Sequence, residues 1–235
     1  VEESRLGIPL LFAMDVVHGY RTIMPVPLGM AASFDPDIAR RAARVAAVEA
    51  SVSGLHWTFA PMIDIARDAR WGRVVEGAGE DPYLGSRMAE AQILGFQTDD
   101  LANPEALLAC AKHFGAYGAG EGGRDYDRAD ISDETLHEVY LPPFQAAIAA
   151  GAGSFMTAFN ELNGVPTTGN AELVRSLLRE QWDYQGLVVS DWNAILELVA
   201  HGAASDPVEA AALALRAGVD MDMTSETYAN HLEQA

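Results

Sequence analysis

Short apolar runs alternate along the chain with longer stretches that carry helix signals. A run of four to eight apolar residues is typical of a strand that is buried on both faces, although its length alone does not exclude a buried helix. We predict strands in the runs at residues 8–14, 55–61, 107–111, 154–159, 187–190 and 219–223.

Three Asp-Pro pairs predict helix starts. In Asp35-Pro36, Asp81-Pro82 and Asp206-Pro207 the aspartate is a favourable N-cap, and proline suits the first helical position. After the first pair, the helical period places four apolar residues on one face, which we expect to be buried. These residues are Ile38, Ala42, Val45 and Ala46.

Further signals mark the ends of the Asp206 helix and of one more helix. After Asp206, Glu209 is placed for a capping box and Gly218 is placed to end the helix. Ser132 is expected to cap a further helix, and Pro142-Pro143 should bend it.

The alternation of strand and helix predicts about six parallel βαβ units and therefore an α/β fold. A closed eight-unit barrel needs about 250 residues, and this chain has 235. We predict a (β/α)8 TIM-type barrel that is incomplete at the N-terminus, with an open doubly wound sheet as the alternative. The barrel is favoured because polar residues follow nearly every predicted strand and would converge on one mouth: Asp15, Asp64, Lys112, His113, Asn160, Asp191 and Asp222.

Composition excludes several classes of protein. Apolar residues make up 49% of the chain, which is too many for a disordered protein. The apolar runs are far shorter than the roughly 20 residues of a membrane span. Cys110 is the only cysteine, so an internal disulfide and a cysteine zinc site are excluded. The net charge of −19 would repel a nucleic-acid backbone.

Both ends of the sequence suggest a piece of a larger protein. Residues 1–4 include no initiator methionine and no basic-then-apolar signal region, and residues 231–235 resemble a helix cut short. We therefore expect residues 1–235 to be a single catalytic barrel domain, with a further domain beyond residue 235. The missing signal region then says nothing about where the protein resides.

Three polar segments could carry chemistry. Asp191 ends an apolar run, where it could be a nucleophile, a base, a metal ligand or the cap of the next helix. Arg70 and Arg73 flank Trp71-Gly72 and could grip hydroxyls or anions, or else form internal ion pairs with nearby carboxylates. Lys112-His113 follows a buried strand and favours a polar pocket, because a lysine is rarely buried without a partner.

The sequence lacks the motifs of nucleotide binding, zinc hydrolysis and serine or threonine nucleophiles. The glycine-rich segment 115–123 has no Gly-Lys-Ser/Thr ending and is followed by acidic residues that would repel phosphate. The six histidines show no His-Glu-x-x-His spacing. Thr157 and Ser190 have no nucleophile-elbow context. We therefore predict no metal and no other cofactor.

Seven segments in a fixed order resemble the barrel domain of family 3 glycoside hydrolases, in particular the bacterial periplasmic β-glucosidase branch. The resemblance covers residues 8–223. Each segment is weak alone, but the ordered set is specific: residues 13–19, 60–64, 70–73, 79–83, 112–114, 156–164 and 188–192.

The resemblance implies roles for seven residues. Asp191 matches the catalytic nucleophile, and Trp192 and Met156 match apolar walls of the −1 subsite. The residues that match those holding the sugar hydroxyls are Asp15, Arg73, Lys112 and His113.

Two positions depart from patterns found in the family. Phe159 lies where relatives often carry a tyrosine near the nucleophile. The loop 115–126 has no histidine, which disfavours the branch that cleaves N-acetylglucosaminides.

The resemblance implies a retaining, exo-acting β-glucosidase that is periplasmic or secreted. Its substrate would be a β-glucoside or oligosaccharide, and neither nucleic acid nor a membrane is an expected partner. Relatives of this branch supply the acid/base glutamate from a C-terminal domain; Glu76, Glu80 and Glu121 are local candidates that do not match that role. A β-xylosidase and a catalytically silent carbohydrate-binding barrel remain alternatives.

Overall fold

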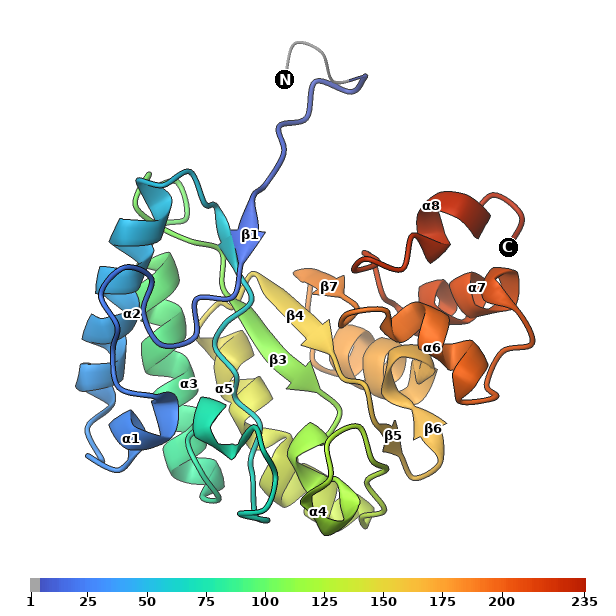
Figure 1. Ribbon diagram of the computed structural model, residues 1–235, viewed down its shortest axis with the longest axis horizontal. Coiled ribbons are helices and arrows are strands. Elements are labelled where there is room, and N and C mark those ends of the chain that lie inside the picture. Colours follow the sequence, from blue (N-terminus) through green and yellow to red (C-terminus); the bar gives the residue numbers. More distant parts are fainter. Residues whose placement is uncertain (1–4) are drawn as a thin grey trace.

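The computed structural model describes residues 5–235, so the expectation for residues 1–4 lies outside the described part of the chain (Figure 1). Strand β1 (Ala13–Met14) pairs in parallel with β2 (Trp57–Thr58). Strands β3 (Cys110–Phe114), β4 (Ser154–Thr157) and β7 (Leu187–Val189) form a parallel sheet in that order.

Isolated parallel bridges join these strands into one succession. Trp57 bridges to Leu108 ahead of β3, and Val189 in β7 bridges to Met221. The parallel segments therefore follow one another in chain order, as in a TIM-type barrel. This confirms the predicted α/β fold, although the sheet does not close within residues 5–235.

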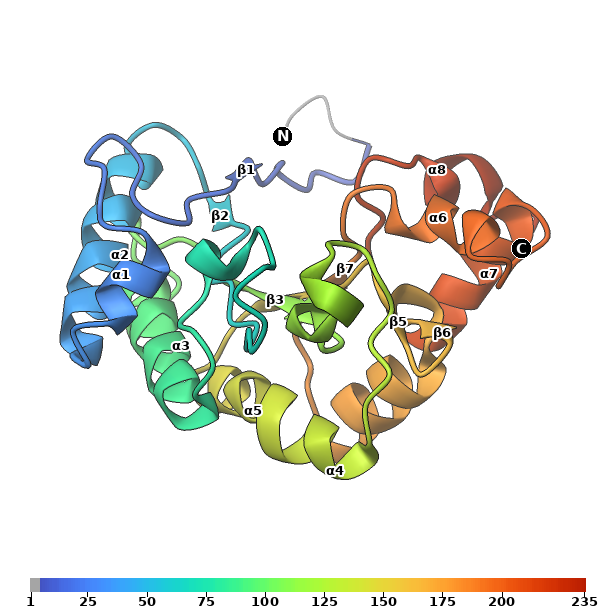
Figure 2. The same ribbon diagram turned by 60° about the horizontal axis from the view of Figure 1, so that its bottom comes forward.

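Helices cover the outer side of the strands. Figure 2 shows α2, α3, α5 and α4 as an outer arc with β2, β3 and β7 inside it. The helices are α1 (Pro27–Ala31), α2 (Pro36–Ser51), α3 (Pro82–Gln97), α4 (Asp133–Thr135), α5 (Pro142–Ala149), α6 (Ala194–Ala200), α7 (Pro207–Ala217) and α8 (Thr227–His231), with π-helical segments at Leu136–Tyr140 and Glu172–Gln181. A small antiparallel hairpin pairs β5 (Glu161–Leu162) with β6 (Val165–Pro166).

The three predicted helix starts are confirmed. The carboxylates of Asp35, Asp81 and Asp206 accept hydrogen bonds from backbone N–H groups at 3.0, 2.7 and 2.9 Å. The capping box is displaced by one residue, because Glu209 accepts from the backbone N–H of Ser205, not from that of Asp206. Gly218 ends α7 with φ 105°, as predicted.

The predicted face of α2 is buried only in part: Ala46 is buried, Ile38 and Ala42 are half-buried, and Val45 is exposed. Val45 is 41% exposed, whereas the buried residues are small alanines. The cause lies on α3, where a Cβ added to Gly95 would lie 2.4 Å from the carbonyl oxygen of Arg40. Two helices this close leave room only for small side chains between them. The buried residues of α2 are Ala39, Ala43, Ala46, Ala47 and Ala50.

The first and last predicted strands are shorter than their apolar runs. Only Ala13–Met14 of the run at residues 8–14 is a strand, and Leu10 is 76% exposed. One edge of β1 pairs with β2, and no strand of residues 5–235 pairs with its other edge. The run at residues 219–223 contributes only the bridge at Met221.

The helix predicted from Ser132 is divided into separate segments. Ser132 Oγ accepts a hydrogen bond from the Thr135 N–H at 3.1 Å, which confirms the cap. A π-helical turn follows, and α5 begins at Pro142. Phe144 from α5 packs against Phe114 in β3 at 5.1 Å and against Phe155 in β4 at 5.7 Å between ring centroids. These aromatic contacts fix β3 and β4 on the helical layer and so position the residues at the strand ends.

Candidate active site

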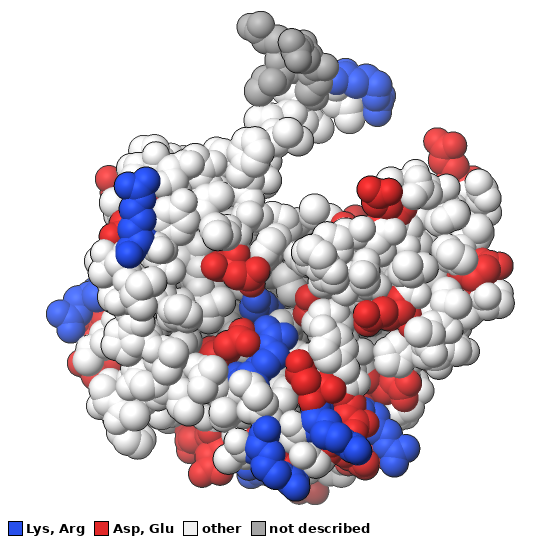
Figure 3. Space-filling model, in the orientation of Figure 1, with Lys and Arg blue, Asp and Glu red and all other residues white. Residues whose placement is uncertain are grey.

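A cavity of about 510 Å³ opens at the carboxyl ends of the parallel strands. Figure 3 shows basic and acidic side chains gathered around the hollow in the middle of this face. The structure brings all seven predicted site residues to this cavity. They are Asp15, Arg73, Lys112, His113, Met156, Asp191 and Trp192.

Each of these side chains comes from the end of a strand or from the segment after it. Asp15 follows β1, Met156 lies in β4, and Asp191 comes two residues after β7. Lys112 and His113 are neighbours in β3, yet both line the cavity. The register between β3 and β4 shifts between Ala111 and Phe114, and such an irregularity re-aims side chains from the usual alternation.

The carboxylate of Asp191 is almost enclosed, with 7% of the residue exposed. Its Oδ1 accepts a hydrogen bond from the Trp192 N–H at 2.7 Å, while its Oδ2 has no hydrogen-bond partner. Burial raises the pKa of Asp191 to about 6, against the lowering effects of the Trp192 N–H and the positive charges of Lys112 and Arg73. One oxygen of this buried carboxylate, on a residue that lines the cavity, is therefore left without a hydrogen-bond donor.

The interpretation of Asp191 as a helix cap is wrong. Helix α6 begins at Ala194 and is preceded by Asn193, whose φ is 59°. The Asp191 side chain bonds to the N–H of the next residue and does not reach the first turn of α6. Its position is therefore not explained by helix capping.

His113 lies between two carboxylates. Its Nδ1 is 2.8 Å from Asp64 Oδ2, which also accepts a hydrogen bond from the His113 backbone N–H at 2.9 Å. Its Nε2 faces Asp191 Oδ2 at 3.4 Å. Burial raises the pKa of Asp64 to about 7 and lowers the pKa of His113 well below its usual value. Asp64 thus holds the imidazole from behind and does not itself line the cavity.

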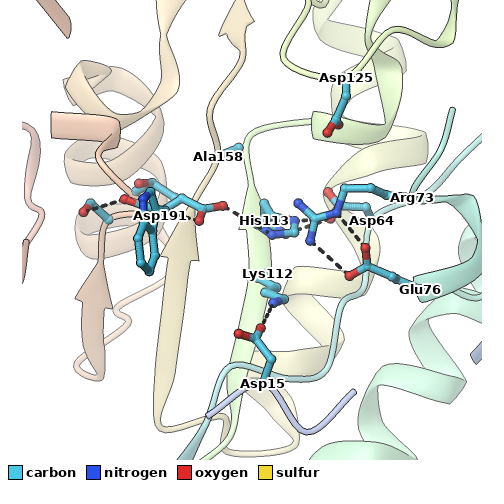
Figure 4. A network of polar contacts seen from close by, with 12 residues as sticks. Asp15, Asp64, Arg73, Glu76, Lys112, His113, Asp125, Ala158 and Asp191 are labelled. Carbon is cyan, nitrogen blue, oxygen red and sulfur yellow. Dashed lines mark hydrogen bonds and ion pairs between the residues drawn. The ribbon is translucent and has the colours of Figure 1, made fainter. Parts of the chain in front are cut away.

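Two cations on the cavity wall already have carboxylate partners (Figure 4). Lys112 Nζ donates to Asp15 Oδ1 at 2.6 Å, and the Arg73 guanidinium donates to both oxygens of Glu76 at 2.7 and 3.0 Å. Arg73 therefore satisfies both interpretations, since it forms an internal ion pair and lines the cavity. Arg70 pairs with Asp68 outside the cavity, as the ion-pair alternative predicted.

The local acid/base candidates do not reach the cavity. Glu76 is held by Arg73, Glu80 is exposed, and Glu121 faces Arg128 at 3.6 Å. None of the three lines the cavity. Among residues 5–235, the cavity carboxylates are those of Asp15, Asp191 and Asp222.

Two of the predicted strand-end residues, Asp64 and Asn160, do not line the cavity, which corrects their expected place at its mouth. Asn160 is buried away from the cavity and donates from Nδ2 to the carbonyls of Gly115 and Glu161 at 3.1 and 3.2 Å. Its expected place at the mouth is therefore wrong, because its side chain serves the backbone of two loops. Asp222 lines the cavity as expected.

Tyr126 was not among the residues predicted from the sequence. This residue lines the cavity beside Phe159, with ring centroids 4.3 Å apart and planes tilted by 37°. The only signal in the sequence is an aromatic residue directly after a glycine-rich loop, which is too common to identify a site. Phe59, Met221, Met223 and Thr224 complete the lining.

Parallel strands whose carboxyl ends surround a cavity with charged side chains in its wall define the barrel class of enzyme site. The family model described as the glycosyl hydrolase family 3 N terminal domain matches residues 1–235. The chain belongs to this family, and the resemblance drawn from its ordered motifs is confirmed.

The similar proteins include enzymes named as β-glucosidases and enzymes named as β-xylosidases. The chain is 48% identical over 229 residues to the "Periplasmic beta-glucosidase" of Salmonella typhimurium, covering 97% of this chain and 30% of that protein. It is 39% identical over 234 residues to a "Putative beta-xylosidase" of Formosa agariphila, covering 96% and 31%. The chain therefore spans about a third of the length of these relatives.

A solved structure gives the same picture. The crystal structure of a β-glucosidase from Listeria innocua is similar to this chain with a TM-score of 0.96 and 46% identity. The match covers 99% of this chain and 33% of that one, and the structure of that enzyme in complex with glucose matches equally well. Separately, no helix among residues 5–235 has the length and apolar character needed to cross a membrane.

Proposed function

We propose that this chain is the sugar-binding barrel of a retaining, exo-acting β-glucosidase, in which Asp191 is the nucleophile. The observation that carries the proposal is the free Oδ2 of Asp191, an almost enclosed carboxylate oxygen in a cavity lined by hydrogen-bonding side chains. The names of the relatives in Salmonella and Listeria support a glucoside as the substrate.

The reaction would proceed in two displacements. Asp191 Oδ2 attacks the anomeric carbon and forms a glycosyl ester, while the bond to the leaving oxygen breaks and that oxygen takes a proton from an acid. Water then attacks the same carbon, giving its proton to the acid/base and releasing Asp191. The raised pKa of Asp191 still leaves this carboxylate ionised at neutral pH, as the first step requires.

The cavity would hold the sugar through its hydroxyls. Asp15 accepts hydrogen bonds, while Lys112 and Arg73 donate them, so alternating partners around the ring would fix its orientation. His113 lies next to the attacking oxygen, held from behind by Asp64. Met156 and Trp192 offer apolar surface to the C–H faces of the ring.

We propose that the acid/base is a glutamate on a C-terminal domain of the same protein. Two observations support this: none of Glu76, Glu80 and Glu121 lines the cavity, and the relatives are about three times as long as this chain. The periplasmic relative supports a periplasmic or secreted location.

A β-xylosidase is the second candidate, favoured by the names of relatives at 39% identity. The two sugars differ in the C6 hydroxymethyl group. The ratio of kcat/KM for 4-nitrophenyl β-glucoside to that for the xyloside, measured on the full-length protein, separates these functions.

A trapping experiment tests the assignment of the nucleophile. A 2-deoxy-2-fluoro glucoside should esterify the full-length protein, and mass spectrometry of its digest should place the sugar on Asp191. A label on another carboxylate would overturn the assignment. A protein that hydrolyses no glycoside under any condition would support the silent carbohydrate-binding barrel.

A further inference from the structure

Tyr126 is an exposed aromatic residue held at the edge of the cavity. It is 52% exposed and lines the cavity, where its ring packs on Phe159. Its φ is 65°, in the left-handed region that bulky residues rarely adopt. Residues in such strained conformations persist where the surroundings enforce them, and they gather at functional sites.

The loop around Tyr126 is held by one contact to another segment and by one contact within the loop. Asp125 accepts a hydrogen bond from Trp71 Nε1 at 2.8 Å, which fastens the loop to the segment that carries Arg73. Within the loop, Arg124 pairs with Asp127 at 2.6 Å. These contacts hold the Tyr126 ring over Phe159 although half of the residue is in contact with solvent.

The exposure of the lining residues divides the cavity into an inner part and an outer edge. The inner part is formed by the buried Lys112, His113, Met156 and Asp191. Tyr126 belongs to the outer edge, as do Trp192, which is 59% exposed, and Asp15, whose side chain is 60% exposed. A sugar whose anomeric carbon meets Asp191 fills the inner part and reaches Asp15 and Trp192 at the edge, so Tyr126 is left for whatever extends from that sugar towards solvent.

We propose that Tyr126 is a specificity-determining residue that packs its ring against the leaving-group portion of the substrate. The inference rests on the proposed function and adds the identity of one wall of the leaving-group site. An aromatic face packs well on an aryl group or on the C–H surface of a second sugar. Tyr126 should therefore favour substrates with a ring in that position over those with a small alkyl group.

The experiment compares Tyr126→Ala and Tyr126→Phe with the wild type, all in the full-length protein. Tyr83→Ala is the matched control, because Tyr83 is an exposed tyrosine on α3 that does not line the cavity. The measurements are KM and kcat for 4-nitrophenyl β-glucoside and for methyl β-glucoside, the inhibition constant of glucose, and the melting temperature.

Tyr126→Ala should raise KM for the aryl glucoside by about five- to tenfold, the size expected for the loss of one aromatic contact. Its inhibition constant for glucose, which carries no leaving group to meet Tyr126, should stay within about twofold of the wild type. Tyr126→Phe keeps the ring and should resemble the wild type, as should Tyr83→Ala.

Three results would overturn the inference. An unchanged KM in Tyr126→Ala would show that the ring does not touch the leaving group. Equal weakening of glucose and of the aryl glucoside would assign Tyr126 to the inner sugar site or to folding. A wild-type protein that hydrolyses no glycoside would overturn the proposed function and this inference with it, whereas an active wild type with a neutral Tyr126→Ala overturns this inference alone.

Discussion

Two regions of the molecule contain charged side chains in a recess, and they differ in how far these side chains have hydrogen-bond partners. Beside Tyr184, Arg179 donates to the carbonyl oxygens of Tyr184 and Gly186 at 3.1 and 2.5 Å and pairs with Asp220. Arg175 nearby donates to the carbonyl oxygen of Arg216 at 2.5 Å. These guanidinium groups are engaged by the chain's own backbone.

Around His113, at the wall of the other recess, buried polar atoms lack partners, and of these only the Asp191 oxygen belongs to a residue that lines the cavity. Five buried side-chain atoms of residues 5–235 lack a hydrogen-bond partner, and three of them belong to Asp64, Tyr117 and Asp191 around His113. An unpartnered buried polar atom destabilises the folded chain, so its presence calls for an explanation. We infer that the Arg179 contacts stabilise the fold, whereas the unpartnered Oδ2 of Asp191 is left for a bound ligand.

The sharpest test of this difference is Asp191→Ala. If this carboxylate is the nucleophile, its removal should lower kcat of the full-length protein by at least about 10³-fold. Azide should restore part of the activity on a dinitrophenyl glucoside by attacking in its place. Activity within tenfold of the wild type would show that Asp191 is not the nucleophile.

Arg179→Ala should act on stability instead. Because it removes hydrogen bonds to several carbonyls and a charged partner, the free energy of unfolding should fall by about 3 kcal/mol. At temperatures where both proteins are folded, kcat/KM should not change. Arg216→Ala is the matched control, because its side chain is exposed and should change stability by less than about 0.5 kcal/mol. An equal effect of the two variants would contradict the structural role of Arg179.

Asp191→Asn should stabilise the protein in a pH-dependent way. The folded pKa of about 6 exceeds the ordinary value of 3.8, so ionisation opposes folding, and this opposition grows from about pH 4 to pH 6 and is complete above it. The variant should therefore match the wild type near pH 4 and exceed it by on the order of 2 kcal/mol at pH 7. Asp64 titrates in the same range but is present in both proteins. Denaturant unfolding at the two pH values measures the difference, and a gain that is equal at both would contradict the assigned pKa.

Arg73→Ala and Lys112→Ala should reduce kcat/KM by at least about tenfold, which corresponds to about 1.4 kcal/mol of transition-state stabilisation. The melting temperature should change little. Arg70→Ala is the matched control, since Arg70 also pairs with a carboxylate but does not line the cavity. A large fall in melting temperature with nearly normal kinetics would show that Arg73, like Arg179, mainly stabilises the fold.

The sequence predicted the features that depend on local chemistry or on strand order. The Asp-Pro helix starts need only a few neighbouring residues, and all three occur. Asp15, Lys112, His113 and Asp191 could be predicted to meet because the ends of parallel strands converge, whereas Arg73, Met156 and Trp192 were expected there only from the family resemblance.

The features that depend on distant partners could not be predicted. The buried face of α2 is set by Gly95, which lies on another helix. The hydrogen bond between Asp64 and the His113 N–H joins residues 49 positions apart, and no pattern in either segment predicts it. Tyr126 lines the cavity from a loop whose Asp125 is hydrogen-bonded to Trp71, 54 positions away.

The open edge of β1 favours self-association of the isolated chain. Leu10, Leu11 and Phe12 are exposed beside a strand edge that no strand of residues 5–235 covers. An extended apolar edge is a template on which a second copy can add a strand. Concentrated preparations of the isolated chain should therefore self-associate through residues 8–14, and polar replacements at Leu10 and Phe12 are the first changes to make for a soluble sample.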